Sequence, residues 1–242
     1  MKRFFYTQTD STNLEARRLV HEKSENPPFW VVTGNQYAGR GHDKNSWESS
    51  PGVNFLGTYV FCPESINASK QFEISQLVSL GIVSFLELFI EDVKIKWPND
   101  IYVGNRKIAG ILIENEITGS NISLSSIGIG LNVNQEHFVS DAPNPVSMKQ
   151  IFDIEYNLDE ISLLLEKSVQ DKVNLLQGVD IQYSECYLKY LYRYKQFAPY
   201  RSGNKWFEAR IIGIGEFGEL LLEEKSGNTL SFGFKEVEFL LS

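Results

Sequence analysis

Three short segments of the chain carry residue types that could bind and activate a small anionic ligand. The first, residues 36–47, reads QYAGRGHDKNSW and combines glycines, basic side chains and a tryptophan. Glycine lets a backbone approach a ligand closely, the fork of Arg40 pairs with carboxylate or phosphate, and Trp47 offers a flat apolar wall. The segment suits a small acidic ligand beside a nucleotide phosphate, although a flexible surface loop explains the same composition.

The second segment, residues 96–114, reads KWPNDIYVGNRKIAGILIE and contains a turn followed by a strand. Asn-Asp after Pro98 is a common turn sequence, and Lys107 opens a run of apolar residues. A cation at the mouth of a buried strand, beside the carboxylate of Asp100, is a candidate electrostatic clamp. Gly110 in the middle of this strand indicates the close approach of another group.

The third segment, residues 128–134, reads GIGLNVN at the end of an expected strand. Gly128 and Gly130 precede Asn132, but the third glycine and the following helix of a dinucleotide-binding fingerprint are missing. We therefore reject a Rossmann interpretation. Glycines in a strand also mark bulges, and this segment taken alone favours that simpler interpretation.

The elements expected around these segments mix strands and helices without regular alternation, which favours an α+β fold. The first helix is expected to begin with Thr12 as its cap and Glu15 reaching back in a capping box. Strands are expected over residues 29–33, 53–61, 93–96, 101–103, 107–117 and 122–131, and helices over residues 12–23, 69–89, 158–176 and 181–194.

The sequence pattern changes after residue 199, where short expected strands alternate with turn signals up to residue 241. This pattern predicts a small barrel of SH3 type. We expect one domain over residues 1–195 and a second, SH3-like domain over residues 196–242.

Bulk composition limits the classes of function. The net charge of −8 argues against unspecific binding to nucleic acid, which needs a basic face. No apolar run approaches the roughly 20 residues that span a bilayer, and no secretory leader is visible. Cys62 and Cys186 lack metal-ligand spacing, so no zinc site is expected, and they fit a reducing compartment. We expect a cytoplasmic protein without membrane or nucleic-acid partners.

The order and spacing of the three segments closely resemble the biotin–protein ligase family. That family carries a GRG…W loop, KWPND, a K-[IL]-A-G-[IL]-L-x-E strand and GxGxN, which here occupy residues 39–47, 96–100, 107–114 and 128–132. Residues 11–13, Ser-Thr-Asn, match the family's biotin-contacting triplet. The resemblance is specific from about residue 6 to residue 134 and looser beyond. It implies a class II synthetase-like α+β catalytic domain with a small C-terminal SH3-like domain.

The activity implied by this resemblance has two steps. Biotin and ATP, with Mg²⁺, give biotinyl-5′-AMP and pyrophosphate, and a lysine of a biotin carboxyl carrier protein then attacks the mixed anhydride. The resemblance also implies a monomer or a homodimer. Because the chain begins almost directly at the expected catalytic domain, we expect a monofunctional ligase without an N-terminal DNA-binding domain.

The resemblance assigns roles to individual residues. The triplet and Gln36 would hydrogen-bond the ureido end of biotin or neighbouring groups. Arg40 and Lys107 would neutralise the carboxylate and the α-phosphate, which otherwise repel each other. Asp100 would orient or deprotonate the attacking lysine, and Asn132 would touch the adenine. The expected catalytic residues are Arg40, Asp100 and Lys107, and the expected binding residues are Ser11, Thr12, Asn13, Gln36, Gly39, Arg40, Gly41, His42, Trp47, Lys107, Gly110, Gly128, Gly130 and Asn132.

Three positions depart from the family pattern. His42 stands where a basic residue is common, Lys44 where a glycine is common, and Thr58 replaces a common serine. Residues two apart in an extended segment face the same side. We therefore hypothesise that Lys44 helps to close the loop over the adenylate.

Two alternatives remain. A lipoate–protein ligase or octanoyltransferase belongs to the same superfamily, but its RRxxGGGxVFH-type stretch is missing. An inactive binding module or a transcriptional regulator is a different class of interpretation. The intact Arg40, Asp100 and Lys107 oppose inactivity, and the acidic charge and missing DNA-binding domain oppose regulation.

Overall fold

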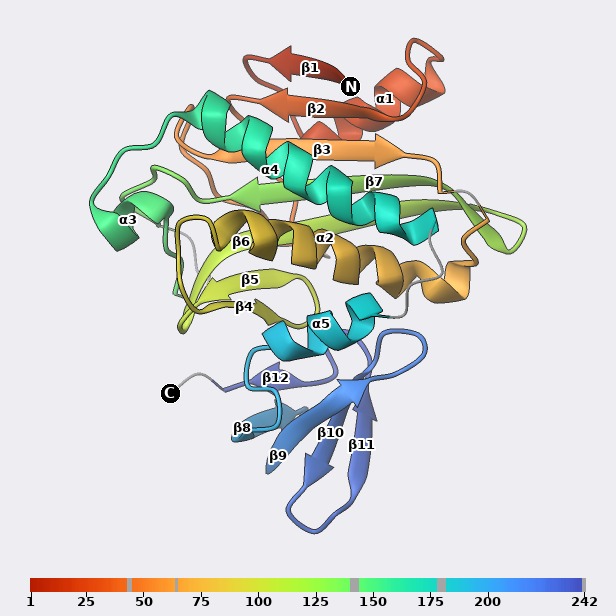
Figure 1. The fold of residues 1–242 in the computed structure, drawn as a ribbon, viewed down its shortest axis with the longest axis vertical. Coiled ribbons are helices and arrows are strands. Elements are labelled where there is room, and N and C mark those ends of the chain that lie inside the picture. Colours follow the sequence, from red (N-terminus) through yellow and green to blue (C-terminus); the bar gives the residue numbers. More distant parts are fainter. Residues whose placement is uncertain (43–44, 64, 140–143, 178–181, 241–242) are drawn as a thin grey trace.

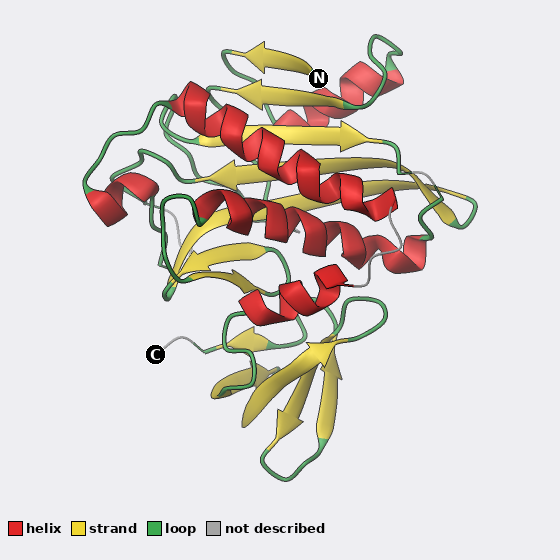
Figure 2. Ribbon diagram, in the orientation of Figure 1, coloured by secondary structure: helices red, strands yellow, loops and turns green. Residues whose placement is uncertain are grey.

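The computed structural model describes residues 1–42, 45–63, 65–139, 144–177 and 182–240, in which two sheets carry most of the backbone (Figure 1, Figure 2). The larger sheet has seven strands in the order β1-β2-β3-β7-β6-β5-β4. Its strands are antiparallel except for the parallel pair β1–β2. The strands are β1 (Lys2–Tyr6), β2 (Phe29–Thr33), β3 (Phe55–Phe61), β4 (Val93–Lys96), β5 (Asp100–Val103), β6 (Arg106–Thr118) and β7 (Asn121–Leu131).

Helices cover both faces of this sheet. The long helices α2 (Gln71–Leu86) and α4 (Leu158–Val173) lie side by side across one face, and α1 (Thr12–His21) packs on β2, β3 and β7 (Figure 1). Side chains alternate along a strand, and β2 divides accordingly. Phe29 and Val31 pack with Ala16 of α1, whereas Trp30 and Val32 join the larger core on the other face. Both faces of β2 are therefore buried.

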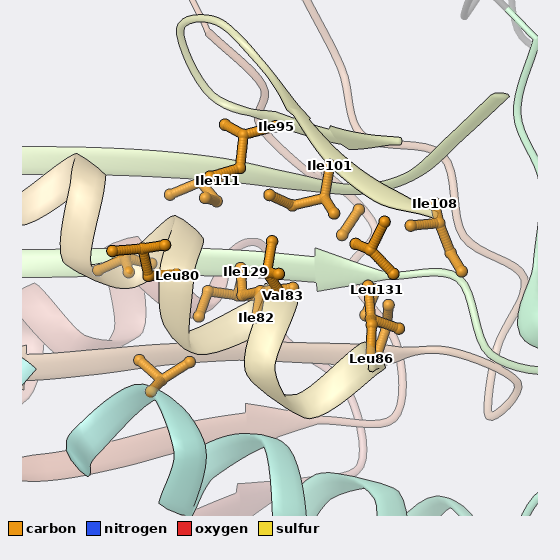
Figure 3. Packing of buried hydrophobic residues seen from close by; sticks show 14 of the residues in the cluster. Leu80, Ile82, Val83, Leu86, Ile95, Ile101, Ile108, Ile111, Ile129 and Leu131 are labelled. Carbon is orange, nitrogen blue, oxygen red and sulfur yellow. The ribbon is translucent and has the colours of Figure 1, made fainter. Parts of the chain in front are cut away.

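The larger core is an aliphatic interface between α2 and the strands. Figure 3 shows Leu80, Val83 and Leu86 of α2 pointing toward isoleucines of β4, β5, β6 and β7. Burying side chains of this size contributes about 1.5–3 kcal/mol each. The same cluster continues into the small sheet through Tyr200 and Ile211. One continuous core therefore holds the two sheets against each other.

The smaller sheet begins at Phe197 and is antiparallel throughout, with the order β11-β10-β9-β8-β12. The all-β character expected after residue 199 is confirmed, while the SH3-like description and the boundary at residue 195 stay predictions. Its strands are β8 (Phe197–Ser202), β9 (Lys205–Ile214), β10 (Leu220–Glu224), β11 (Thr229–Phe232) and β12 (Glu238–Phe239). The remaining elements are α3 (Met148–Phe152), α5 (Gln182–Tyr190), η1 (Ala68–Lys70) and η2 (Asn174–Gln177).

Several helix ends differ from the prediction. The prediction that Thr12 caps α1 is wrong: Ser11 is the N-cap, and it makes no side-chain capping bond. The first helix ends at His21 and not at Lys23, whose φ of +53° is left-handed. The last helix ends at Tyr190, before Arg193 and Lys195, which also have positive φ. Helix α2 is shorter than predicted at both ends.

Two elements were not predicted. Strand β1 lies at the edge of the large sheet and is only partly buried, so its sequence lacks a clear alternation. Helix α3 is only five residues long, but Ser147 and Gln150 form a capping box at its start, a sequence signal that could have revealed it. No helix in the described residues is long and apolar enough to cross a membrane.

Candidate functional site

A cavity of ≈ 630 Å³ lies where the three motif segments meet. Its walls come from the start of α1, the glycine-rich segment 36–47, the β4–β5 turn, the middle of β6 and the end of β7. A further wall comes from residues 234–239, which form the turn before β12 and β12 itself in the C-terminal part of the chain. Every predicted site residue lines the cavity except Gly39 and Asn132.

The triplet at the start of α1 is held by hydrogen bonds on several sides. The backbone N–H and the hydroxyl of Thr12 both donate to Gln36 Oε1, at 2.8 and 3.1 Å. Asn13 donates from Nδ2 to Glu114 Oε2 at 2.8 Å, and its Oδ1 accepts from the Thr58 hydroxyl at 2.6 Å. These bonds fix both ends of the Asn13 amide and leave its orientation determined before any ligand binds.

Thr58 lies beneath this triplet in β3 and is completely buried. Replacing it with valine keeps the volume but leaves Asn13 Oδ1 without its donor, and we expect a loss of about 2 kcal/mol in the free energy of unfolding. Urea denaturation measures this loss. Thr118→Val, at the exposed end of β6, is the control and should change stability by less than about 0.5 kcal/mol. Equal stability of the two variants would show that the Thr58 bond contributes nothing.

The motif glycines lie where side chains approach the sheet closely. A Cβ at Gly110 would lie 2.7 Å from the Trp47 indole, and one at Gly130 would lie 2.7 Å from Trp47 Cζ2 and closer to Cε2. A Cβ at Gly128 would lie 2.5 Å from Asn13 Oδ1. The approach expected at Gly110 is confirmed. The β7 ladder shows no register shift at Gly128 or Gly130, so the bulge interpretation is wrong there.

Two ion pairs bring charge to the cavity. Lys107 Nζ lies 2.6 Å from Asp100 Oδ1, and both side chains are mostly buried. The same Nζ lies 5.6 Å from the ring centroid of Trp47. The predicted neighbourhood of cation and carboxylate is therefore present at the cavity wall. Arg40 pairs with Glu114 at 3.1 Å. Its guanidinium therefore lies beside the carboxylate that accepts from Asn13 of the triplet.

Sequence reasoning assigned no role to several residues at this site. Glu114 ended the second motif, but nothing in its spacing indicated that it would pair with Arg40. Lys96 lines the cavity with Nζ over the rings of Tyr102 and Phe239, and burial lowers the pKa of its ammonium. The position of Lys96 in KWPND was the available signal.

The C-terminal wall had no sequence signal. Phe234 stacks on His42 of the glycine-rich segment, with centroids 5.4 Å apart and planes at 10°. Its other stacking partner is Trp97, also at 5.4 Å and 22°. Trp97 donates from Nε1 to the Gly218 carbonyl at 2.9 Å. An aromatic stack therefore joins the loop, the β4–β5 turn and the small sheet.

Two predicted residues lie away from the cavity, and one falls outside the described part of the chain. The Gly39 carbonyl accepts from the Trp47 N–H at 3.1 Å, which shapes the loop. Asn132 is buried and donates from Nδ2 to the Val146 carbonyl at 3.1 Å. Its proposed contact with adenine stays a prediction. Lys44, to which we assigned loop closure, lies outside the described residues.

Comparison with known proteins agrees with these features. Residues 4–132 match the model of the biotin/lipoate A/B protein ligase family. The chain is 36% identical over 129 residues to the biotin–[acetyl-CoA-carboxylase] ligase of Paracoccus denitrificans, covering 52% of each protein. It is 28% identical over 235 residues to the bifunctional ligase/repressor BirA of Bacillus spizizenii, covering 90% of this chain and 68% of that protein.

The fold also matches solved structures. Biotin protein ligase from Aquifex aeolicus, in complex with biotin and ATP, superposes with a TM-score of 0.78 at 19% identity, covering 100% of this chain and 99% of that one. This likeness confirms the predicted α+β fold. Because the family model spans more than half of the sequence and contains the triplet, the first two motif segments and residues 128–132 of the third, the chain belongs to the biotin/lipoate A/B protein ligase family.

Proposed function

We propose that this chain is a biotin–protein ligase that forms biotinyl-5′-AMP and transfers biotin to a lysine of a biotin carboxyl carrier protein. The observation that carries the proposal is the composition of one cavity. It joins a hydrogen-bonding triplet, glycines of the two central strands and the Lys107–Asp100 pair. A ligand with a polar head, an apolar body and a carboxylate fits such a cavity.

In the first step, an oxygen of the biotin carboxylate bonds to the α-phosphorus of ATP while the bond to pyrophosphate breaks. Both reacting groups are negatively charged, and their repulsion raises the barrier. Lys107 and Arg40 would offset that repulsion, since both line the cavity. Asp100 holds the Lys107 ammonium in place at 2.6 Å and so reduces the reorganisation that the step requires.

In the second step, the amine of the acceptor lysine bonds to the carbonyl carbon of the mixed anhydride, and AMP leaves with the bridging oxygen. The attacking amine loses a proton during this step, and Asp100 is the carboxylate at the cavity wall that we assign to receive it. The proton thus passes to a carboxylate that already contacts a cation.

ATP would enter as its Mg²⁺ complex. Asp100 and Glu238 both line the cavity, but each already pairs with a basic side chain, Lys107 and Arg201 respectively. Mg²⁺ is commonly held by substrate phosphates and one or two carboxylates. The donors here fit that arrangement, with the phosphates supplying most of the oxygen ligands.

The related proteins support biotin over lipoate. The first two relatives described above are named as a biotin ligase and a ligase/repressor, and the Aquifex aeolicus structure contains biotin and ATP. The glycine-rich stretch of lipoate ligases is missing from the sequence. We therefore assign biotin as the acyl substrate and keep lipoate as the alternative to be tested.

The test compares acyl substrates side by side. The protein is incubated with MgATP and either biotin, lipoate or octanoate, and pyrophosphate release is measured. A biotin carboxyl carrier domain is then added, and its mass shows whether the acyl group was attached. We expect release and attachment with biotin alone. Release with lipoate and none with biotin would replace our proposal with the alternative.

We further propose that the protein does not bind operator DNA, since the net charge of −8 disfavours a phosphate backbone. Sequence-dependent DNA binding tighter than about micromolar at physiological salt, the range of specific complexes, would contradict this part alone.

A further inference from the structure

A second set of polar contacts lies just outside the cavity, in the turn before α1. Arg18, one and a half turns into the helix, reaches back to Asp10 with both ends of its guanidinium. Its NH1 donates to Asp10 Oδ2 at 3.0 Å and its NH2 to Oδ1 at 2.8 Å. A fork of this kind fixes the plane of the carboxylate as well as its position. Arg18 does not line the cavity.

Asp10 passes this constraint to the triplet. Its Oδ1 accepts from the backbone N–H of Ser11 at 2.7 Å and from the hydroxyl of Thr9 at 3.1 Å. Ser11 is the N-cap of α1, and its side chain makes no capping bond. The carboxylate of Asp10, the preceding residue, therefore orders this turn by accepting from the Ser11 N–H. The hydrogen-bonded Arg18 guanidinium holds the pKa of Asp10 well below its ordinary range, because the pair favours the ionised carboxylate.

The same turn also anchors the base of the glycine-rich segment. The Asp10 carbonyl accepts from the Ala38 N–H at 3.0 Å, and the Thr9 carbonyl accepts from the Tyr37 N–H at 3.1 Å. The two stretches of backbone then continue into the cavity wall, one as the triplet and the other as the segment that contains Arg40. Asp10 is thus bonded to both walls at the point where they separate.

We propose that Arg18 is a positioning residue for the biotin-binding end of the cavity, acting through Asp10 on the triplet and on the glycine-rich segment. This inference rests on the proposed function for its substrate. Asp100 lies on β5 and Lys107 on β6, and no contact joins Arg18 to them in the described residues. Arg18 therefore affects chiefly the binding of biotin, because its route to the chemical step is indirect and passes through the glycine-rich segment that carries Arg40.

The experiment replaces Arg18 with methionine, which keeps the apolar stem and removes the fork. We expect KM for biotin to rise about fivefold, the effect that one partly exposed charged pair supports, while kcat and KM for ATP stay within about twofold. Arg18→Lys keeps the charge without the fork and should fall between the wild type and the methionine variant. Asp10→Asn, which keeps the shape and removes the charge, should raise KM for biotin in the same direction.

Arg17 provides a matched control. It is the neighbouring arginine on α1, has a similarly exposed side chain, and pairs only loosely, at 3.8 Å, with Glu116. Arg17→Met should leave KM and kcat within about twofold of the wild type. Equal values for the two methionine variants would overturn the inference.

A measurement without ligand separates this inference from the proposed function. Amide hydrogen exchange, followed by NMR in the ligand-free protein, should be faster at Ser11 and Ala38 in Arg18→Met than in Arg17→Met. Unchanged exchange at both amides contradicts the inference whatever the enzyme does. A wild-type protein that releases no pyrophosphate with biotin refutes the proposed function, while the exchange rates still decide whether Arg18 orders the turn.

Discussion

Replacing Lys107 with alanine is expected to slow formation of biotinyl-5′-AMP about a hundredfold, on the order of 3 kcal/mol in the barrier, while the protein stays folded. This is the loss of rate expected when an enzyme loses one positive charge that is already in position beside the phosphate, where negative charge accumulates during the reaction. Lys107 meets this condition because its side chain is mostly buried and held by Asp100 at 2.6 Å. Single-turnover release of pyrophosphate measures the step directly.

Lys94→Ala serves as the control for this prediction. Lys94 lies on β4, two strands away in the same sheet, pairs with Asp92 at 3.2 Å, and does not line the cavity. Its loss should leave pyrophosphate release unchanged. A folded Lys107→Ala protein with a near-normal rate would mean that the cation acting on the phosphate is another residue, with Lys96 the next candidate along the cavity wall.

Gly130→Ala is expected to lower kcat/KM for biotin about a hundredfold without unfolding the sheet. The added methyl group would collide with the Trp47 indole, which lies directly over this glycine. Alanine is compatible with an extended backbone, so the strand persists and the indole moves instead. A displacement of about 1 Å in a group that shapes a reacting site costs on the order of a hundredfold in rate.

Gly213→Ala tests whether the effect is specific to the cavity. Gly213 lies in β9, where a Cβ would meet only Leu221 at an ordinary 3.8 Å. This variant should keep its activity, and thermal melting of both proteins shows whether either sheet has lost stability. If Gly130→Ala retains normal kcat/KM, the position of Trp47 is unimportant for the ligand.

The parts of the molecule that sequence predicted best depend on local pattern. Strands β6 and β7 have 13 and 11 residues, and their apolar residues gave bounds within two residues of those observed. The cavity residues that belong to short motifs were predicted for the same reason. Interactions between distant segments left no such pattern. The Arg40–Glu114 pair spans 74 residues of sequence, and neither residue type specifies the other.

The first helix shows how a local rule fails. Ser/Thr followed three residues later by Glu indicates a capping box, and Thr12 with Glu15 satisfies that pattern. The hydroxyl of Thr12 donates to Gln36, and Glu15 pairs with Arg18. A tertiary contact at the cavity thus takes the Thr12 hydroxyl, and an ion pair within the helix takes the Glu15 carboxylate. A binding site is where such a departure from local preference is expected.

The wall formed by residues 234–239 has a consequence for the synthesis of the protein. The triplet at residues 11–13 leaves the ribosome early, but Phe234 stacks on His42 only after more than 190 further residues have been added. A nascent chain can complete most of the large sheet before that point, since β7 ends at Leu131. Its cavity still lacks one side. This side of the cavity can therefore close only after Phe234 has been made, and a shorter nascent chain lacks the His42–Phe234 contact.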